Sequence, residues 1–129
     1  MPFIKNTVLL VDDNAMNMQL QSDLLELGGF RVLNAVTAED ALDRVHIDRP
    51  DIVLMDVSLP GMDGLTATRL LKNDSRTAAI PVVALTAQAM AGDKEQALSA
   101  GCVGYIVKPI DTRRFAQTVR DYFNIRNTI

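Results

Sequence analysis

Short apolar runs alternate with amphipathic segments along the chain. Each run is rich in valine, isoleucine and leucine and is bounded by polar or turn-forming residues, a composition typical of β-strands. The runs predict strands at residues 8–11, 32–33, 52–55, 82–85 and 105–107.

The segments between these runs place apolar residues at helical spacing. Gly28 is placed to end the first helix, and Thr37 is placed as the N-cap of the second. We therefore expect helices at 16–27, 38–45, 65–71, 94–100 and 111–123. The first helix is predicted from the apolar positions Met16, Leu20, Leu24 and Leu27. In the last helix, Phe115, Val119 and Tyr122 are expected to face inward.

The alternation of strand and helix predicts an α/β fold, in which helices cover both faces of a parallel sheet. The nearly continuous apolar runs at 8–11, 52–55 and 82–85 suit strands that are buried on both faces, whereas the mixed segment 31–35 suits an edge. We expect a doubly wound, five-stranded sheet of order 2-1-3-4-5, as in flavodoxin-like folds. Ligands of such sheets bind at the carboxyl ends of the strands, near the first and third strands.

Composition narrows the class of protein. The chain has 129 residues, 48% of them hydrophobic, which suits one domain over residues 1–129. A net charge of −3 argues against a nucleic-acid partner. There is no signal-peptide pattern and no apolar stretch long enough to span a membrane, and Cys102 is the only cysteine. We expect a cytoplasmic protein without a zinc site.

Polar residues follow four of the predicted strands. Asp12 and Asp13 follow the first, Asp56 the third, Thr86 the fourth and Lys108 the fifth. Because the strands are expected to be parallel, these side chains should meet at one edge of the sheet. Carboxylates held so close together repel one another unless a cation lies between them. Mg²⁺, which prefers oxygen ligands, is the natural cation, with Mn²⁺ as an alternative.

Four motifs around these residues resemble the response-regulator receiver family, which has the fold of the bacterial chemotaxis regulator. They are VLLVDDN, IVLMDVSLPGMDG, PVVALTA and YIVKPI, and the likeness runs over about residues 7–123. By this resemblance, Asp56 is the phosphoacceptor, and Asp12 and Asp13 are the acidic pair that holds Mg²⁺. Asp13, Asp56 and the backbone carbonyl of Ser58 would be direct metal ligands.

The resemblance also implies roles for three residues at the ends of later strands. Thr86 and Lys108 would hold phosphoryl oxygens, and Tyr105 would change rotamer when the Thr86 hydroxyl turns toward the phosphoryl group. The bond between Lys108 and Pro109 is a candidate cis peptide, because this isomer is common only before proline.

The function implied is that of a single-domain response regulator in two-component or phosphorelay signalling. It would accept a phosphoryl group from phosphohistidine, catalyse only its own phosphorylation and dephosphorylation, and signal through protein contacts. Expected partners are a histidine kinase or a histidine phosphotransfer protein, and a downstream protein. The expected docking face combines the helix at 94–100, the strand at 105–107 and the helix at 111–123, with Lys94, Arg113, Arg114 and Arg120 nearby.

Three other functions share part of this pattern. Haloacid-dehalogenase-type phosphatases carry an acid-base aspartate two residues after the nucleophile, where this chain has Ser58. An FMN-binding flavodoxin needs a phosphate-cradling loop after its first strand, where Asp12 and Asp13 would repel a phosphate. A receiver that works without phosphorylation usually lacks the acceptor or the acidic pair, and both are present. We expect His46, the only histidine, to face solvent rather than to take part in catalysis.

Overall fold

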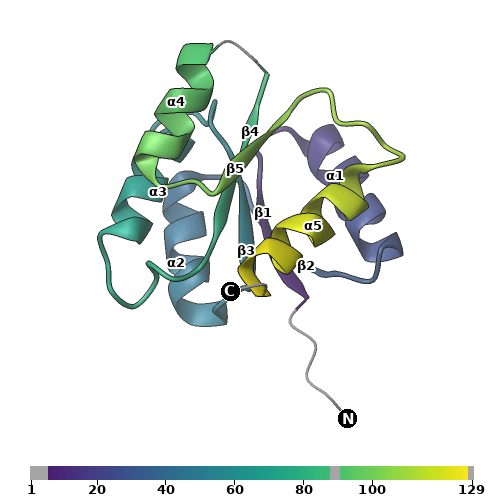
Figure 1. Cartoon of the computed structure of the whole chain (residues 1–129), viewed down its shortest axis with the longest axis horizontal. Helices are drawn as coiled ribbons and strands as arrows, with labels where there is room; N and C mark the ends of the chain where they lie inside the picture. The colour runs from purple at the N-terminus through teal and green to yellow at the C-terminus, as the bar shows by residue number, and fades with distance from the viewer. Residues whose placement is uncertain (1–5, 88–90, 128–129) are drawn as a thin grey trace.

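The computed structural model describes residues 6–87 and 91–127, where five strands alternate with five helices (Figure 1). All neighbouring strands are parallel, in the order β2-β1-β3-β4-β5, so the predicted topology is confirmed. The strands are β1 (Thr7–Val11), β2 (Arg31–Ala35), β3 (Ile52–Asp56), β4 (Val82–Thr86) and β5 (Gly104–Val107). The helices are α1 (Ala15–Leu27), α2 (Ala38–Asp48), α3 (Gly64–Lys72), α4 (Ala91–Ala100) and α5 (Phe115–Asn127).

The helices lie in two layers, with α1 and α5 on one face of the sheet and α2, α3 and α4 on the other (Figure 1). Successive side chains of a strand point to opposite faces, so each central strand contributes to two cores. Leu9 and Met55 lie in the core beneath α2 and α3, whereas Leu10 and Leu54 lie in the core beneath α1 and α5. The sheet is therefore doubly wound, as predicted.

Burial distinguishes the central strands from the edges. Every residue of β3 and β4 is buried, and so is β1 from Val8 onward. In β2 only Ala35 is fully buried, and in β5 only Gly104, so these two strands form the edges. The expectation that residues 31–35 form an edge strand is confirmed.

Helix caps follow the sequence signals. The Thr37 side chain accepts a hydrogen bond from the Asp40 backbone N–H at 3.0 Å, as predicted for an N-cap. Gly28 ends α1, and its N–H bonds to the Leu24 carbonyl at 3.1 Å. Asn14 caps the start of α1 by accepting from the Asn17 N–H at 3.0 Å. Helix α1 thus begins directly after the Asp12–Asp13 pair.

Of the four apolar positions that mark α1 in the sequence, Leu24 is half-buried against the core, but the other three lie outside the face that this helix buries. Met16 is 82% exposed and Leu27 is 86% exposed, and Leu20 is also exposed. The buried side is formed by Met18, Gln21, Ser22 and Leu25. The helix carries apolar residues on two sides. Packing against the sheet buries the side that contains Met18 and Leu25.

The last two helices begin at other residues than expected. Helix α4 begins at Ala91 instead of 94. Helix α5 begins at Phe115 instead of 111, because residues 111–114 form a turn in which the Asp111 carbonyl accepts from the Phe115 N–H at 2.9 Å. Phe115 and Val119 face the core as predicted, and Tyr122 is half-buried.

Arg120 does not join the expected docking face. Its guanidinium stacks on the Phe30 ring, 4.1 Å from the centroid, and donates to the Gly28 carbonyl at 3.0 Å. Arg120 therefore ties α5 to the end of α1.

Candidate functional site

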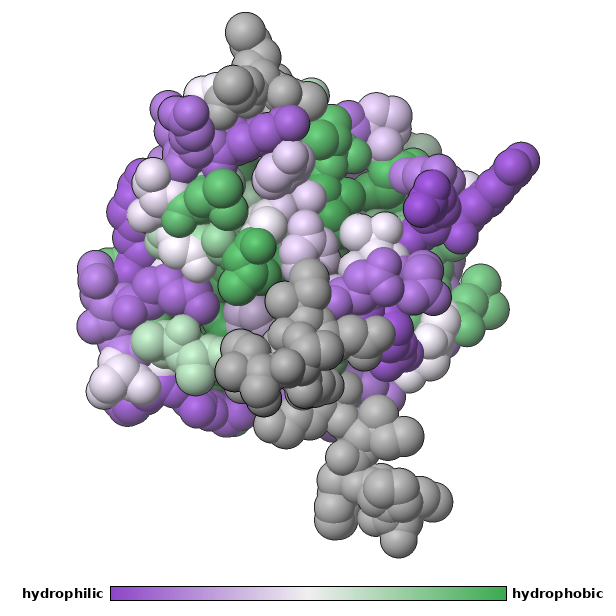
Figure 2. Space-filling view, in the orientation of Figure 1, coloured by the Kyte–Doolittle hydropathy of each residue, from purple (hydrophilic) through white to green (hydrophobic). Residues whose placement is uncertain are grey.

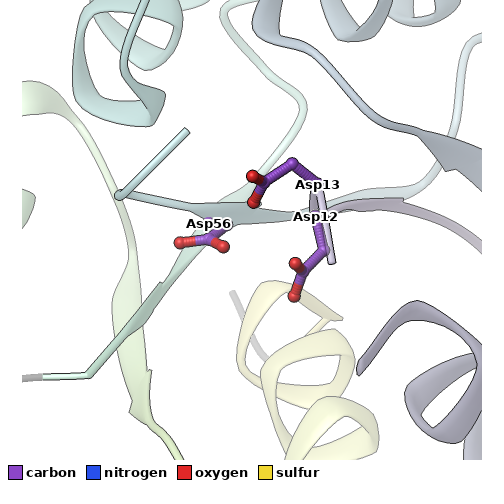
Figure 3. Close-up of side chains that lie close together, drawn as sticks. All are labelled: Asp12, Asp13 and Asp56. Atoms are coloured by element: carbon purple, nitrogen blue, oxygen red, sulfur yellow. The ribbon is translucent and has the colours of Figure 1, made fainter. Parts of the chain in front are cut away.

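Three carboxylates meet at the carboxyl edge of the sheet. Asp12 and Asp13 follow β1, and Asp56 is the last residue of the neighbouring strand β3. One carboxylate oxygen from each lies within 4.8 Å of the others, and Figure 3 shows the three side chains gathered at the ends of the two strands. Asp12 is fully buried and Asp56 is 4% exposed, whereas Asp13 is exposed to solvent. The sequence correctly predicted that these residues come together.

Backbone hydrogen bonds hold the two buried carboxylates in place. The Asn14 N–H donates to Asp12 Oδ1 at 2.9 Å, and the Ser58 N–H donates to Asp56 Oδ1 at 2.9 Å. Each aspartate thus bonds the backbone two residues further on, the usual geometry of an aspartate turn. The same arrangement leaves Oδ2 of both carboxylates directed at other partners.

Lys108 bridges the two buried carboxylates. Its Nζ lies 2.9 Å from Asp56 Oδ2 and 3.1 Å from Asp12 Oδ2. Burial by itself lowers the pKa of Lys108, but hydrogen bonds and charge attraction from Asp56 and Asp12 outweigh it, so this pKa lies above its usual value. The Lys108 N–H also bonds to the Thr86 carbonyl at 2.7 Å, and the predicted cis bond to Pro109 is present. Lys108 is therefore an ammonium ion that neutralises part of the acidic pocket.

The remaining predicted residues differ in burial and in their distance from this pocket. Thr86 ends β4 and is 8% exposed. Ser58 is exposed on the loop after β3. Tyr105 is half-buried on β5, with Lys94 Nζ 5.1 Å from its ring centroid, and its backbone carbonyl accepts from the Tyr122 hydroxyl at 3.4 Å. Thr86 thus lies at the pocket, and Tyr105 lies beside α4.

Gly64, the first residue of α3, allows the loop after β3 to close over the pocket. A Cβ at this position would overlap the backbone carbonyl oxygen of Asp56 and the Met55 side chain. Only glycine permits so close an approach of α3 to the end of β3. Gly61 and Gly64 follow Asp56 in the sequence, but the close contact of Gly64 with the end of β3 was not predicted.

Gln21 is a pocket residue that the sequence analysis missed. It lies on the buried side of α1, is 3% exposed, and its Nε2 donates to Asp12 Oδ2 at 3.3 Å. A polar residue at a position where the helix buries its side chain was the available signal. It was hidden because the apolar stripe of α1 pointed to a different face.

The donor set suits Mg²⁺. All three acidic side chains offer oxygen, the ligand atom that hard divalent cations prefer, and Mg²⁺ commonly takes one or two carboxylates and keeps several waters. The pocket carries three carboxylates and one ammonium group, so it has charge left for a cation to neutralise. The acidic cluster is therefore consistent with a magnesium site.

A doubly wound parallel sheet whose carboxyl edge holds three carboxylates, two of them bridged by a lysine, is the arrangement expected of a receiver domain. The family model for the response regulator receiver domain matches residues 8–120, and the chain belongs to this family. It is thus a response regulator, with Asp12, Asp13 and Asp56 forming the acidic pocket for phosphoacceptance, and not an enzyme that turns over outside substrates.

Relatives agree with this assignment. The polar-differentiation response regulator DivK of Brucella anthropi is 43% identical over 116 residues, which cover 90% of this chain and 94% of that protein. The receiver domain of a sensor histidine kinase from Pseudomonas aeruginosa is 31% identical with a TM-score of 0.84, and the match covers 94% of this chain and 99% of that one. That structure has a magnesium ion coordinated in its active site cleft. Chemotaxis response regulator CheY4 of Vibrio cholerae is 26% identical, with a TM-score of 0.86 over 92% of this chain and 98% of its own.

The lengths and compositions of the helices bear on whether the chain could cross a membrane. Within residues 6–87 and 91–127, none combines the length and the apolar character that crossing a bilayer requires.

Proposed function

We propose that Asp56 is the residue that accepts the phosphoryl group, from a phosphohistidine of a kinase or phosphotransfer protein. A carboxylate oxygen of Asp56 attacks the phosphorus, the phosphorus–nitrogen bond breaks, and its electron pair returns to the donor imidazole. The product is an acyl phosphate on Asp56. The observation that carries this proposal is that Asp56 alone is both the last residue of a central strand and the carboxylate nearest to the Lys108 ammonium, at 2.9 Å.

The transfer is expected to depend on Mg²⁺ or Mn²⁺. We infer that Asp13, Asp56 and the Ser58 backbone carbonyl are direct ligands and that Asp12 supports the hydrated ion. When bound, the metal neutralises the charge that develops during phosphoryl transfer. Lys108 and the Thr86 hydroxyl hold phosphoryl oxygens and so align the group. Asp13, the exposed carboxylate, lies where an entering ion reaches it first.

A substitution at Asp56 tests the acceptor. Asp56→Asn keeps the shape of the side chain but removes the nucleophile, so we expect no label from acetyl phosphate or from a phosphohistidine donor. Asp43→Asn, a matched change at an exposed aspartate of α2, should be labelled as the parent protein is. Stoichiometric, acid-stable labelling of Asp56→Asn would overturn the assignment.

Phosphorylation is proposed to act on a face formed by α4, β5 and α5. In Figure 1, β5 lies between α4 and α5, and Figure 2 shows in the same view that hydrophobic residues gather near the centre of this face, with hydrophilic residues around them. Lys94, Arg113 and Arg114 lie on or beside it. A downstream protein with a partly apolar, acidic surface fits this face.

Thr86 and Tyr105 are proposed to connect the acceptor to this face. A phosphoryl group adds about −1.5 to −2 charge units and three acceptor oxygens, which the Thr86 hydroxyl can approach. The space behind Thr86 can then take the Tyr105 ring, which now packs beside Lys94. Thr86→Ala should still be phosphorylated on Asp56 but should bind the downstream partner more weakly. Equal affinity of the phosphorylated variant and the phosphorylated parent, measured by calorimetry, would contradict this role.

We also propose that residues 1–129 form one receiver domain that acts in the cytoplasm and serves a two-component system or phosphorelay. A receiver domain implies a histidine kinase as a partner, and this part of the function follows from the family. Phosphotransfer from purified histidine kinases and phosphotransfer proteins of the source organism would identify the donor. A chain that takes label from acetyl phosphate but from none of these donors would contradict the phosphorelay assignment.

A further inference from the structure

Gln21 occupies a position at which a helix normally buries an apolar side chain. It lies between Met18 and Leu25 on the buried side of α1 and is 3% exposed. Its Nε2 donates to Asp12 Oδ2, but its Oε1 is buried and has no hydrogen-bond partner among the described residues. Burying an amide with an unpaired carbonyl costs free energy, so a residue whose only task was packing would better be leucine or methionine. The glutamine therefore needs an explanation in its contact with Asp12.

The Asp12 carboxylate has two other hydrogen-bond partners besides Gln21, and they differ from it in kind. Asp12 Oδ1 accepts from the Asn14 N–H at 2.9 Å, and Oδ2 accepts from Lys108 Nζ at 3.1 Å and from Gln21 Nε2 at 3.3 Å. The backbone bond fixes one oxygen of the carboxylate, and the two side chains fix the other. Lys108 is divided between two carboxylates, since its Nζ also lies 2.9 Å from Asp56 Oδ2. The side chain of Gln21 makes no second hydrogen bond among the described residues.

Lys108 and Gln21 are expected to behave differently when the pocket binds a phosphoryl group. In the proposed function, Lys108 holds a phosphoryl oxygen, and Asp13, Asp56 and the Ser58 carbonyl would hold a metal ion whose charge would neutralise the carboxylates. Asp12 Oδ2 then loses its ammonium partner and keeps the amide of Gln21. A carboxylate next to a metal needs such an outer hydrogen bond to keep its orientation.

We propose that Gln21 is a positioning residue, which holds the Asp12 carboxylate in place for the hydrated metal ion when Lys108 leaves it. The inference rests on the proposed role of Mg²⁺ in phosphoacceptance. Gln21 acts through Asp12 and does not itself touch the phosphoryl group. An open cavity of about 430 Å³ lies beside this contact and is lined by Gln21, Lys108 and Pro109 among others, so the Lys108 side chain borders open space.

Mg²⁺ titration of single variants is the first test. Gln21→Met keeps the length of the side chain and removes the amide, and Gln19→Met makes the same change on the exposed side of the same helix. We expect the dissociation constant for Mg²⁺, measured by calorimetry, to rise about 10-fold in Gln21→Met, the lower end of the range for outer-sphere partners. Gln19→Met should match the parent protein. Equal affinity of Gln21→Met and the parent would overturn the proposal.

A metal-free comparison separates this inference from the proposed function. Crystal structures of Lys108→Met and of Lys108→Met/Gln21→Met, both prepared in chelator, should show the Asp12 carboxylate in its present orientation in the first and rotated in the second. The same orientation in both variants would overturn the positioning role. A parent protein that binds no Mg²⁺ would instead refute the proposed metal dependence, and the crystallographic comparison would still decide the role of Gln21. Should the double variant fail to fold, the titration of the single variants decides.

Discussion

The two ends of the sheet both carry charged clusters, and the clusters differ in burial and in balance. At the carboxyl end, Asp12 and Asp56 are 0% and 4% exposed, Asp13 lies beside them, and Lys108 is the cation that bonds them. At the amino end, the Asp74 carboxylate pairs with Arg76 at 2.9 Å and with His46 at 3.1 Å. The side chains of that second cluster are 25%, 73% and 34% exposed, in the same order.

Such a difference distinguishes a binding site from a surface ion pair. Three carboxylates against one ammonium leave a negative pocket that only a further cation can balance. At Asp74 one carboxylate meets the Arg76 guanidinium and the His46 imidazole, which is charged only when protonated. Both contacts are in reach of water, where ion pairs contribute little to stability. The buried and unbalanced cluster is the one that the receiver family uses. The exposed and balanced cluster links α2 to the turn between α3 and β4.

The largest effect should come from removing the cation of the acidic pocket. Lys108→Met leaves two buried carboxylates without their shared partner, and breaking a buried pair in this way costs about 3 kcal/mol of unfolding free energy. Addition of Mg²⁺ should restore part of this loss, because the ion replaces the missing charge. Urea unfolding in chelator and in Mg²⁺ measures both. A variant as stable as the parent in chelator would show that the pocket does not depend on Lys108.

Removing one carboxylate should have the opposite sign. Asp13→Ala relieves repulsion within the cluster and should raise the unfolding free energy of the metal-free protein by about 1 kcal/mol, the value for exposed charges at this separation. The same variant should lose Mg²⁺ binding, and it should lose more than Asp12→Ala does. Thermal melts in chelator test the predicted change in stability, and metal titrations test the predicted loss of Mg²⁺ binding. Unchanged metal affinity in Asp13→Ala would refute its assignment as a ligand.

The smallest effect is expected at the amino end and depends on pH. Hydrogen bonds to the Leu42 carbonyl and to Asp74 raise the pKa of His46 above its ordinary value of 6.5. Arg76 holds the pKa of Asp74 well below its usual range, so Asp74 stays ionised near neutral pH. The pKa of His46 is higher in the folded than in the unfolded protein. The contribution of His46 to the free energy of unfolding is therefore complete below about pH 6.5 and is lost as pH rises through the pKa of the folded state.

Unfolding free energies measured between pH 5.5 and 8.5 test this contribution. His46 is the only histidine, so the parent protein should lose a small amount of stability over this range and His46→Gln should lose less. Phosphorylation of the two proteins should be the same, since the cluster lies at the opposite end of the sheet from Asp56. Identical pH profiles of stability would show that His46 does not form this ion pair in solution.

Much of the fold and the site could be predicted because their signals are local. Apolar runs of strand length, separated by helical periodicity, predicted the five strands and their order. Because residues at the carboxyl ends of parallel strands lie at one edge of the sheet, the sequence predicted that Asp12, Asp56 and Lys108 meet there. His46 is exposed, as expected. Its bond to Asp74 was not predicted, because the two residues lie 28 positions apart and no local pattern indicates the contact.

The sequence by itself determined the alternation of elements, the sheet topology and the identity of the acidic pocket. The alternation implies parallel strands, and parallel strands bring the residues at their carboxyl ends to one edge. Tertiary structure decided the rotation of α1 about its own axis. The sequence offers apolar residues such as Met16 on one side and Leu25 on another, and only the packing of the whole helix on the sheet selects between them. That rotation turns Gln21 inward to Asp12 and leaves Met16 in solvent, because burial is a property of the assembled layers and not of the helix alone.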